Sequence, residues 1–188
     1  GDVLRPSSEP LRKVALFPSC TIDYNDQHIG QAAVAVLQHN NVEVMLPEHQ
    51  CCSMPLIDIG EYRDSIAKID YNLNKLSKLV DHGYDIVVPQ PTCTLVIRED
   101  YPRMSKNAEI AQKVANHTFE IGSYLTRMAQ DKVLVRDFKN ELGRVAFHVA
   151  CHTRAQAAGI NSPRLLSLVP GTTVETSESC SGHDGSWG

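Results

Sequence analysis

The sequence predicts an α/β fold made of two pseudo-repeated, Rossmann-like βαβ halves with parallel sheets, joined by a helical insert. Short apolar runs alternate with longer segments in which apolar residues recur every three or four positions, a pattern typical of strands and crossover helices. The order strand, cysteine, helix, strand, cysteine occurs in residues 11–105 and again in residues 141–188, a half expected to be truncated. Residues 1–10 are polar and rich in proline and serine, which indicates a linker or tag. Residues 106–140 are expected to be the helical connection.

The first half carries three apolar runs that predict buried parallel strands, at residues 13–17, 42–46 and 85–88. Helices are predicted at residues 29–38 and 61–82. The longer one ends before Gly83, a residue type that favours a helix C-cap. Its apolar side chains fall three or four positions apart and share one face: Ile66, Ile69, Leu73, Leu76 and Val80. A further helix is expected to begin near Thr94.

The second half repeats this order with fewer elements. Strands are predicted at residues 144–149 and 172–176, and between them a helix begins at Ser162-Pro163 and ends at Pro170-Gly171. The two halves therefore predict separate parallel sheets.

Composition excludes several functional classes. The net charge of −4 and a pI near 6.1 argue against a nucleic-acid partner, which requires a basic surface. The sequence has neither an 18-residue apolar run nor a secretory signal. A chain of 188 residues with regular secondary structure does not need disulfide stapling, so its six cysteines indicate reduced thiols in the cytoplasm.

Every cysteine follows a predicted strand. Three successive strands of the first half lead to Cys20, to the pair Cys51-Cys52 and to Cys93. Because parallel strands present their carboxyl ends at one edge of a sheet, we expect these four thiols to converge. Four converging thiolates suit either a zinc ion or an iron–sulfur cluster. The adjacent pair favours a cluster, in which neighbouring cysteines bind different irons.

The second half offers fewer sulfur ligands. Cys151 and Cys180 follow its two strands, and His152 and His183 are nearby imidazole candidates. These four residues are the predicted metal-ligand candidates of this half, with two alternatives left open: that the half is degenerate, or that it binds a metal or a substrate differently. His148 is assigned more readily to the core, or to a position beside a ligand, than to a ligand.

The cysteine pattern resembles the cysteine-rich CCG domain. That domain is found in the cysteine-rich subunits of heterodisulfide reductase and anaerobic glycerol-3-phosphate dehydrogenase, and in the iron–sulfur subunits of glycolate and lactate oxidases. The resemblance covers residues 13–188, and the chain would be a C-terminal fragment of such a protein. The matching segments are Phe17-Pro18-Ser19-Cys20, Cys51-Cys52-Ser53, Pro91-Thr92-Cys93, His148-Val149-Ala150-Cys151-His152 and Cys180-Ser181-Gly182-His183-Asp184-Gly185.

This resemblance implies a component of an iron–sulfur oxidoreductase complex that passes electrons to a quinone or a disulfide. It implies a [4Fe–4S] cluster, readily lost in an aerobic preparation, on Cys20, Cys51, Cys52 and Cys93. Its expected partners are an upstream ferredoxin-like domain and a flavin dehydrogenase subunit. A cytoplasmic location is expected. Whether the complex attaches the protein peripherally to the inner face of the membrane is left open.

Three positions depart from the family pattern. Ser53 follows the cysteine pair where glycine is usual, and Ser181 replaces the second cysteine of the second pair. Gln90 stands where the fullest motif has a fifth cysteine of the first half. Four ligands favour an ordinary [4Fe–4S] cluster over a five-cysteine, non-cubane one.

Three alternative roles of the cysteines remain open. The same thiols could hold a structural or regulatory zinc ion. Cys151 could instead be a nucleophile activated by His148 or His152, with Asp184 as the orienting acid. The thiols could also serve simply as small apolar side chains in the core.

Overall fold

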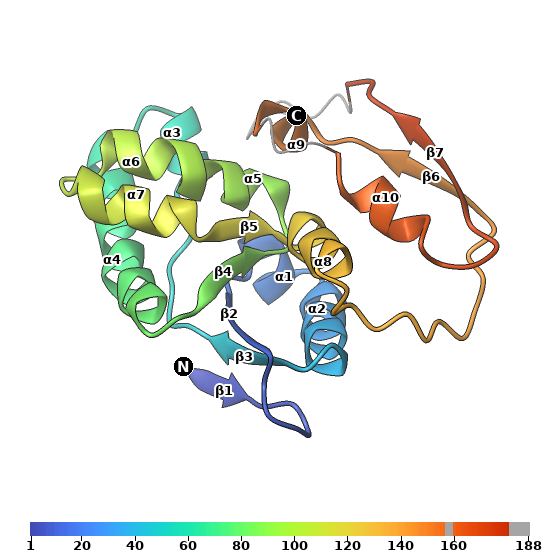
Figure 1. Ribbon diagram of the computed structural model, residues 1–188. Coiled ribbons are helices and arrows are strands. Elements are labelled where there is room, and N and C mark those ends of the chain that lie inside the picture. Colours follow the sequence, from blue (N-terminus) through green and yellow to red (C-terminus); the bar gives the residue numbers. More distant parts are fainter. Residues whose placement is uncertain (157–159, 181–188) are drawn as a thin grey trace. The chain divides into compact units, whose positions relative to one another are not determined.

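The computed structural model describes residues 1–156 and 160–180 (Figure 1). The chain divides into two compact units, Gly1–Ile121 and Gly122–Gly188. Residues 106–140, expected as a helical connection, thus fall on both sides of this boundary.

The first unit is built on a five-stranded, mostly parallel sheet. Its strand order is β1-β3-β2-β4-β5, in which only β1 runs antiparallel to its neighbour. The strands are β1 (Asp2–Leu4), β2 (Arg12–Leu16), β3 (Val42–Leu46), β4 (Asp85–Val88) and β5 (Thr118–Glu120). Val14, Ala15, Ile86 and Val87 on the two central strands are fully buried. Burial on both faces explains why these strands are continuous apolar runs rather than alternating ones.

Helices cover both faces of this sheet (Figure 1). The connection from β2 to β3 passes through α1 (Cys20–Tyr24) and α2 (Gln27–His39) on one face. The connection from β3 to β4 crosses over β2 and passes through α3 (Met54–Asp58) and α4 (Tyr62–Asp81) on the other face. There α4 packs against α7 (Ala108–Asn116). The strand order therefore reverses at β2, and in such sheets the crevice beyond the carboxyl ends at the reversal is the usual ligand site.

One helical stretch near the carboxyl end of β4 contains a π-turn. It consists of α5 (Pro91–Leu95), the π-helix η1 (Val96–Asp100) and α6 (Tyr101–Met104). The Tyr101 N–H donates to the Val96 carbonyl, five residues back. Pro102, the next residue, has no N–H and would clash with the carbonyl four residues before it, so the wider turn accommodates the proline.

The predicted elements of the first half are confirmed, with small shifts at their ends. The long helix runs over Tyr62–Asp81, and Gly83 has φ 82°, the left-handed geometry of a C-cap glycine. Two short strands were not predicted. Asp2–Leu4 lies in the stretch assigned to a linker, and Thr118–Glu120 lies in the stretch assigned to helix. Each has only three residues, too few to show a strand periodicity in the sequence.

The second unit contains the expected parallel pair of strands. β6 (Arg144–His148) pairs with β7 (Thr173–Ser177) along its whole length. The helices of this unit are α8 (Ile121–Gln130, which begins at the last residue of the first unit), α9 (Cys151–Ala155) and α10 (Ser162–Leu166). The predicted order of strand, cysteine, helix and strand is thus confirmed in this half.

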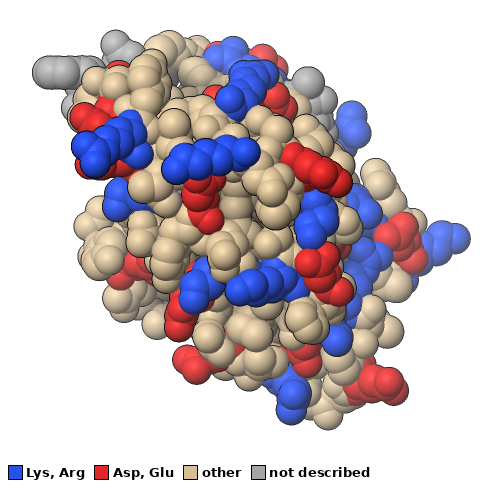
Figure 2. Space-filling model, turned by 90° about the vertical axis from the view of Figure 1, so that its left-hand side faces the viewer, with Lys and Arg blue, Asp and Glu red and all other residues tan. Residues whose placement is uncertain are grey.

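The face drawn in Figure 2 shows no surface patch of a single charge. Lysine and arginine side chains are interspersed there with aspartate and glutamate. Within residues 1–156 and 160–180, no helix combines the length and the apolar character needed to cross a lipid bilayer.

Candidate metal centre

The first unit brings four cysteines to the carboxyl edge of its parallel strands. Cys20 is the first residue of α1 after β2, and Cys93 lies in the first turn of α5 after β4. Cys51 and Cys52 occupy the loop between β3 and α3. Strands β3 and β4 lie on either side of β2 in the sheet, so the cysteines that follow these three strands surround the point where the strand order reverses. We call this group, Cys20, Cys51, Cys52 and Cys93, the four-cysteine site.

The sulfur atoms of the four-cysteine site form a chain of contacts. The Cys20 thiol is within hydrogen-bonding reach of Cys51, Cys51 contacts Cys52, and Cys52 contacts Cys93. The two ends of this chain differ in exposure: Cys20 is exposed and Cys51 partly buried, whereas Cys52 and Cys93 are both buried, at 4% and 7% exposed. The site therefore runs from the protein surface into the core.

Their mutual proximity and burial make these thiols hard to ionise. Burial raises the pKa of Cys20 to about 11, and the neighbouring Cys51 and Asp23 add to the shift. The pKa of Cys51 is raised by its contact with Cys52 and by burial. For Cys52 the contact with Cys51 lowers the pKa, but Cys93 and burial outweigh it, so the net shift is also upward. A metal bound at this site therefore displaces the protons of these thiols.

Two polar clamps hold the loop that carries Cys51 and Cys52. On one side the His49 ring lies between the Pro47 carbonyl (Nδ1 to O, 3.2 Å) and the Asp23 carboxylate on α1 (Nε2 to Oδ2, 3.0 Å). Both contacts are hydrogen bonds when both ring nitrogens carry a proton. The His49 ring also packs edge-on against Phe17, with centroids 4.9 Å apart. This clamp ties the loop to the helix that begins with Cys20.

The second clamp is Asn72 on α4, which is fully buried. Its Oδ1 accepts from the Gln50 N–H at 2.8 Å, and its Nδ2 donates to the carbonyls of Gln50 at 3.1 Å and Cys51 at 3.3 Å. Nδ2 also donates to the Tyr101 hydroxyl at 2.9 Å. A single side chain thus satisfies the backbone on both sides of the Gln50–Cys51 peptide.

The residue after the cysteine pair explains a departure from the family pattern. Ser53 has φ 85° and is fully buried. Glycine adopts this left-handed conformation without strain, which accounts for the glycine usual at this position. Here serine tolerates it, and its hydroxyl donates to the Ser65 carbonyl at 3.3 Å.

The arrangement differs from that of a preformed single-ion site. In the part of the chain that the structure describes, no three His, Cys, Asp or Glu side chains are grouped so as to hold one metal ion. Four soft sulfur donors at one edge of the sheet suit an iron–sulfur cluster, whose cysteines bind separate irons.

The second unit has a less developed site. Cys151 opens α9 after β6, is exposed, and accepts from Arg154 Nη2 at 3.4 Å. Cys180 follows β7 and is also exposed. His148 Nε2 donates to the Ser179 carbonyl at 2.7 Å, and the residue is exposed, so its assignment to the core is wrong. His183 and Asp184 lie outside the described residues, so the predicted metal group of Cys151, His152, Cys180 and His183 stays a prediction.

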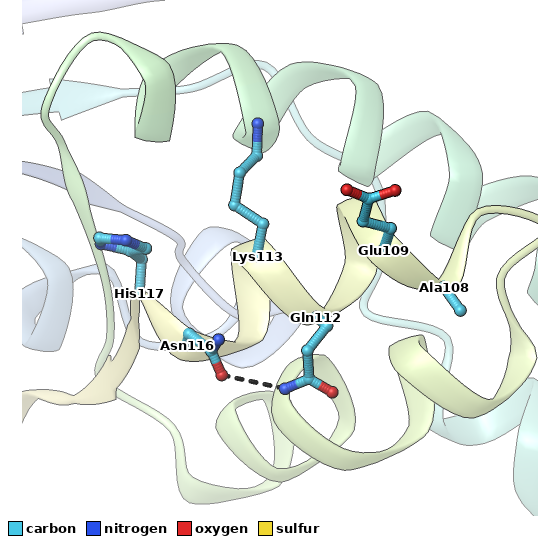
Figure 3. A pocket seen from close by; sticks show the side chains of 6 residues that line it. All are labelled: Ala108, Glu109, Gln112, Lys113, Asn116 and His117. Carbon is cyan, nitrogen blue, oxygen red and sulfur yellow. Dashed lines mark hydrogen bonds between the residues drawn. The ribbon is translucent and has the colours of Figure 1, made fainter.

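Among the surface hollows of the first unit, two are larger than 500 Å³. One, of about 620 Å³, runs along α7 (Figure 3), where Gln112 donates to Asn116 at 2.9 Å and Lys113 binds Asp81 at 2.8 Å. A single helix and the residue that follows it line this hollow, and it contains no cysteine. The other, of about 540 Å³, lies between α1, α2 and β3 and is lined mainly by apolar side chains, with Asp23 and His49 at one side. Asp23 and His49, which line this second hollow, also form the first clamp on the cysteine loop.

The fold and the site together define a cysteine-rich α/β domain. A family model described as "Cysteine-rich domain" (CCG) matches residues 14–98, the segment that contains all four cysteines of the site. Three proteins named lactate utilization protein A align with 93% of this chain and 74% of their own length. They are 31% identical in Bacillus cytotoxicus and 30% identical in Bacillus thuringiensis and Bacillus cereus. No solved structure matches. The chain belongs to the cysteine-rich CCG-domain family that includes lactate utilization protein A.

Three residues that support the four-cysteine site were not predicted. They are Asp23, Asn72 and Tyr101. None of them is part of a recognisable metal-binding motif, and their roles depend on contacts between distant segments. A signal existed for Asn72 alone, because it is a polar residue within the apolar stripe of its helix, three positions after Ile69 and four before Leu76.

Proposed function

We propose that the first unit binds one iron–sulfur cluster through Cys20, Cys51, Cys52 and Cys93 and transfers electrons in the oxidation of lactate. The chain of sulfur contacts at the carboxyl edge of the sheet carries this proposal. The family membership supports the cluster, and the name of the relatives supports lactate as the source of electrons. Four ligands favour a [4Fe–4S] cluster.

When bound, the cluster supplies one-electron transfer. The protein's own contribution is to hold and shield it. Asn72 and His49 fix the backbone of the cysteine loop, while burial of Cys52 and Cys93 excludes water from the inner side of the site. Exposed Cys20 marks the side open to a partner. Hydrogen bonding to sulfur and solvent exposure are the means by which a protein sets a cluster's potential.

We further propose a flavin dehydrogenase subunit and a ferredoxin-like domain as the electron donors, and a quinone or a disulfide as the acceptor. Oxidation of a 2-hydroxy acid releases two electrons and two protons, which a flavin can accept together and pass on singly. The apolar hollow lined in part by Asp23 and His49 is large enough to admit a small organic acceptor.

Anaerobic reconstitution with iron and sulfide tests this function. We expect the wild-type chain to turn brown and to retain iron and acid-labile sulfide in equal amounts, about four of each per cluster. Replacing Cys51 and Cys52 together by serine should abolish this. The matched control replaces Cys151 and Cys180 by serine and should keep the cluster of the first unit. A colourless protein that retains zinc would establish the structural alternative instead. Equal iron retention by the wild type and the Cys51/Cys52 variant would contradict the site.

A further inference from the structure

The hydroxyl of Tyr101 is a buried donor with an unmatched proton. Its side chain is fully buried at the first residue of α6. The oxygen accepts a hydrogen bond from Asn72 Nδ2 at 2.9 Å. A phenol also has one proton to donate, and within residues 1–156 and 160–180 that proton has no acceptor. Because buried donors are rarely left unmatched, an acceptor for this proton is missing from the polypeptide alone.

The nearest chemistry that could supply the acceptor is the four-cysteine site. Tyr101 shares a core cluster with Cys52 and Cys93, and Asn72 joins its hydroxyl to the Cys51 carbonyl through two hydrogen bonds. The remaining proton of the hydroxyl is therefore available for donation toward a sulfur of this site.

The π-turn sets the direction of the tyrosine. Cys93 and Tyr101 are eight residues apart, which in a regular α-helix of about 100° per residue places them about 80° apart around the axis. The π-turn between them absorbs one residue, so the effective spacing is about seven residues and the two side chains share a face. Helical side chains also tilt toward the N-terminus, which for Tyr101 is toward Cys93.

We propose that Tyr101 is a positioning residue of the metal centre: oriented by Asn72, its hydroxyl donates a hydrogen bond to the Cys93 sulfur when that sulfur is bound as a thiolate. The inference rests on the proposed function, since it takes the thiolate to be an iron ligand. A donor to a ligand sulfur stabilises the more negative, reduced form of the cluster, and so it raises the reduction potential.

The test is the reduction potential of the reconstituted chain, compared between the wild type, Tyr101→Phe and the matched control Tyr84→Phe. Tyr84 is also buried in the first unit, but its hydroxyl donates to Glu43, away from the cysteines. We expect Tyr101→Phe to lower the one-electron reduction equilibrium constant about tenfold, a shift of about 59 mV to lower potential. Tyr84→Phe should leave the potential unchanged.

A second substitution keeps the test decisive if Tyr101→Phe does not fold or retain iron. Site-specific 3-fluorotyrosine at position 101 preserves the shape of the ring and makes the hydroxyl a stronger donor, so the potential should move upward. Iron retained with an unchanged potential under this substitution overturns the role of Tyr101 while leaving the proposed function intact. Failure of the wild type itself to assemble a cluster overturns the proposed function and, with it, this inference.

Discussion

Replacement of Asn72 by leucine tests the clamp on the cysteine loop. Leucine has a similar volume but can make none of the four hydrogen bonds that the Asn72 side chain forms with Gln50, Cys51 and Tyr101. A buried polar group left without its partner costs about 1–3 kcal/mol. The Gln50 N–H and the carbonyls of Gln50 and Cys51 lie in a partly buried loop, where hydrogen bonds to water replace some of those lost with Asn72. We therefore expect a loss of about 2–3 kcal/mol in the free energy of unfolding.

Urea unfolding of the metal-free, reduced chain, followed by circular dichroism, measures this loss. The matched control is Asn116→Leu, the same substitution at an exposed position of α7 where the amide accepts from Gln112. It should change stability by less than about 0.5 kcal/mol. A second consequence separates the loop from general stability: Asn72→Leu should also retain less iron after reconstitution than Asn116→Leu. If Asn72→Leu is as stable as the control, the clamp does not hold the loop.

Two further predictions concern the same unit. Burial and the Glu43 carboxylate raise the pKa of Tyr84 from 10.0 to about 12, so folding favours the protonated phenol. The contribution of this phenol to the free energy of unfolding is therefore complete below pH 10 and is lost as the pH rises toward 12. The difference in unfolding free energy between the wild type and Tyr84→Phe should therefore shrink over that range, and a constant difference would contradict the assignment. At Ser53, with φ 85°, valine should cost about 1–3 kcal/mol because a β-branched side chain is strained there, whereas glycine should change the melting temperature little. Equal melting temperatures for Ser53→Val and Ser53→Gly would show that the backbone does not hold this conformation.

The parts of the fold that the sequence predicts are those that depend on local pattern. The runs at β2, β3 and β4 are apolar because both of their faces are covered, and the stripe on α4 repeats at the helical period. The placement of Cys20, Cys51, Cys52 and Cys93 follows from the same strands, because each cysteine comes just beyond a carboxyl end. Strand β5 escaped prediction because Thr118–Glu120 is too short to show a period and gains its place by pairing with β4.

The contacts of the supporting residues could not be predicted because they join residues that are far apart in the chain. His49 reaches Asp23 across 26 residues, and Asn72 reaches Tyr101 across 29. No local pattern marks such pairs. The π-turn is likewise invisible without the structure, although Pro102 within a helical segment marks the place where a regular helix is disrupted.

Iron K-edge X-ray absorption of the anaerobically reconstituted chain tests the central claim most directly, because it reports the ligands of iron and the presence of neighbouring irons together. We predict an all-sulfur environment with an iron–iron scattering component in the wild type, and loss of that component when Cys20, Cys51, Cys52 and Cys93 are replaced by serine. Iron bound by nitrogen and oxygen alone, or a spectrum without iron–iron scattering in the wild type, would contradict the proposed cluster.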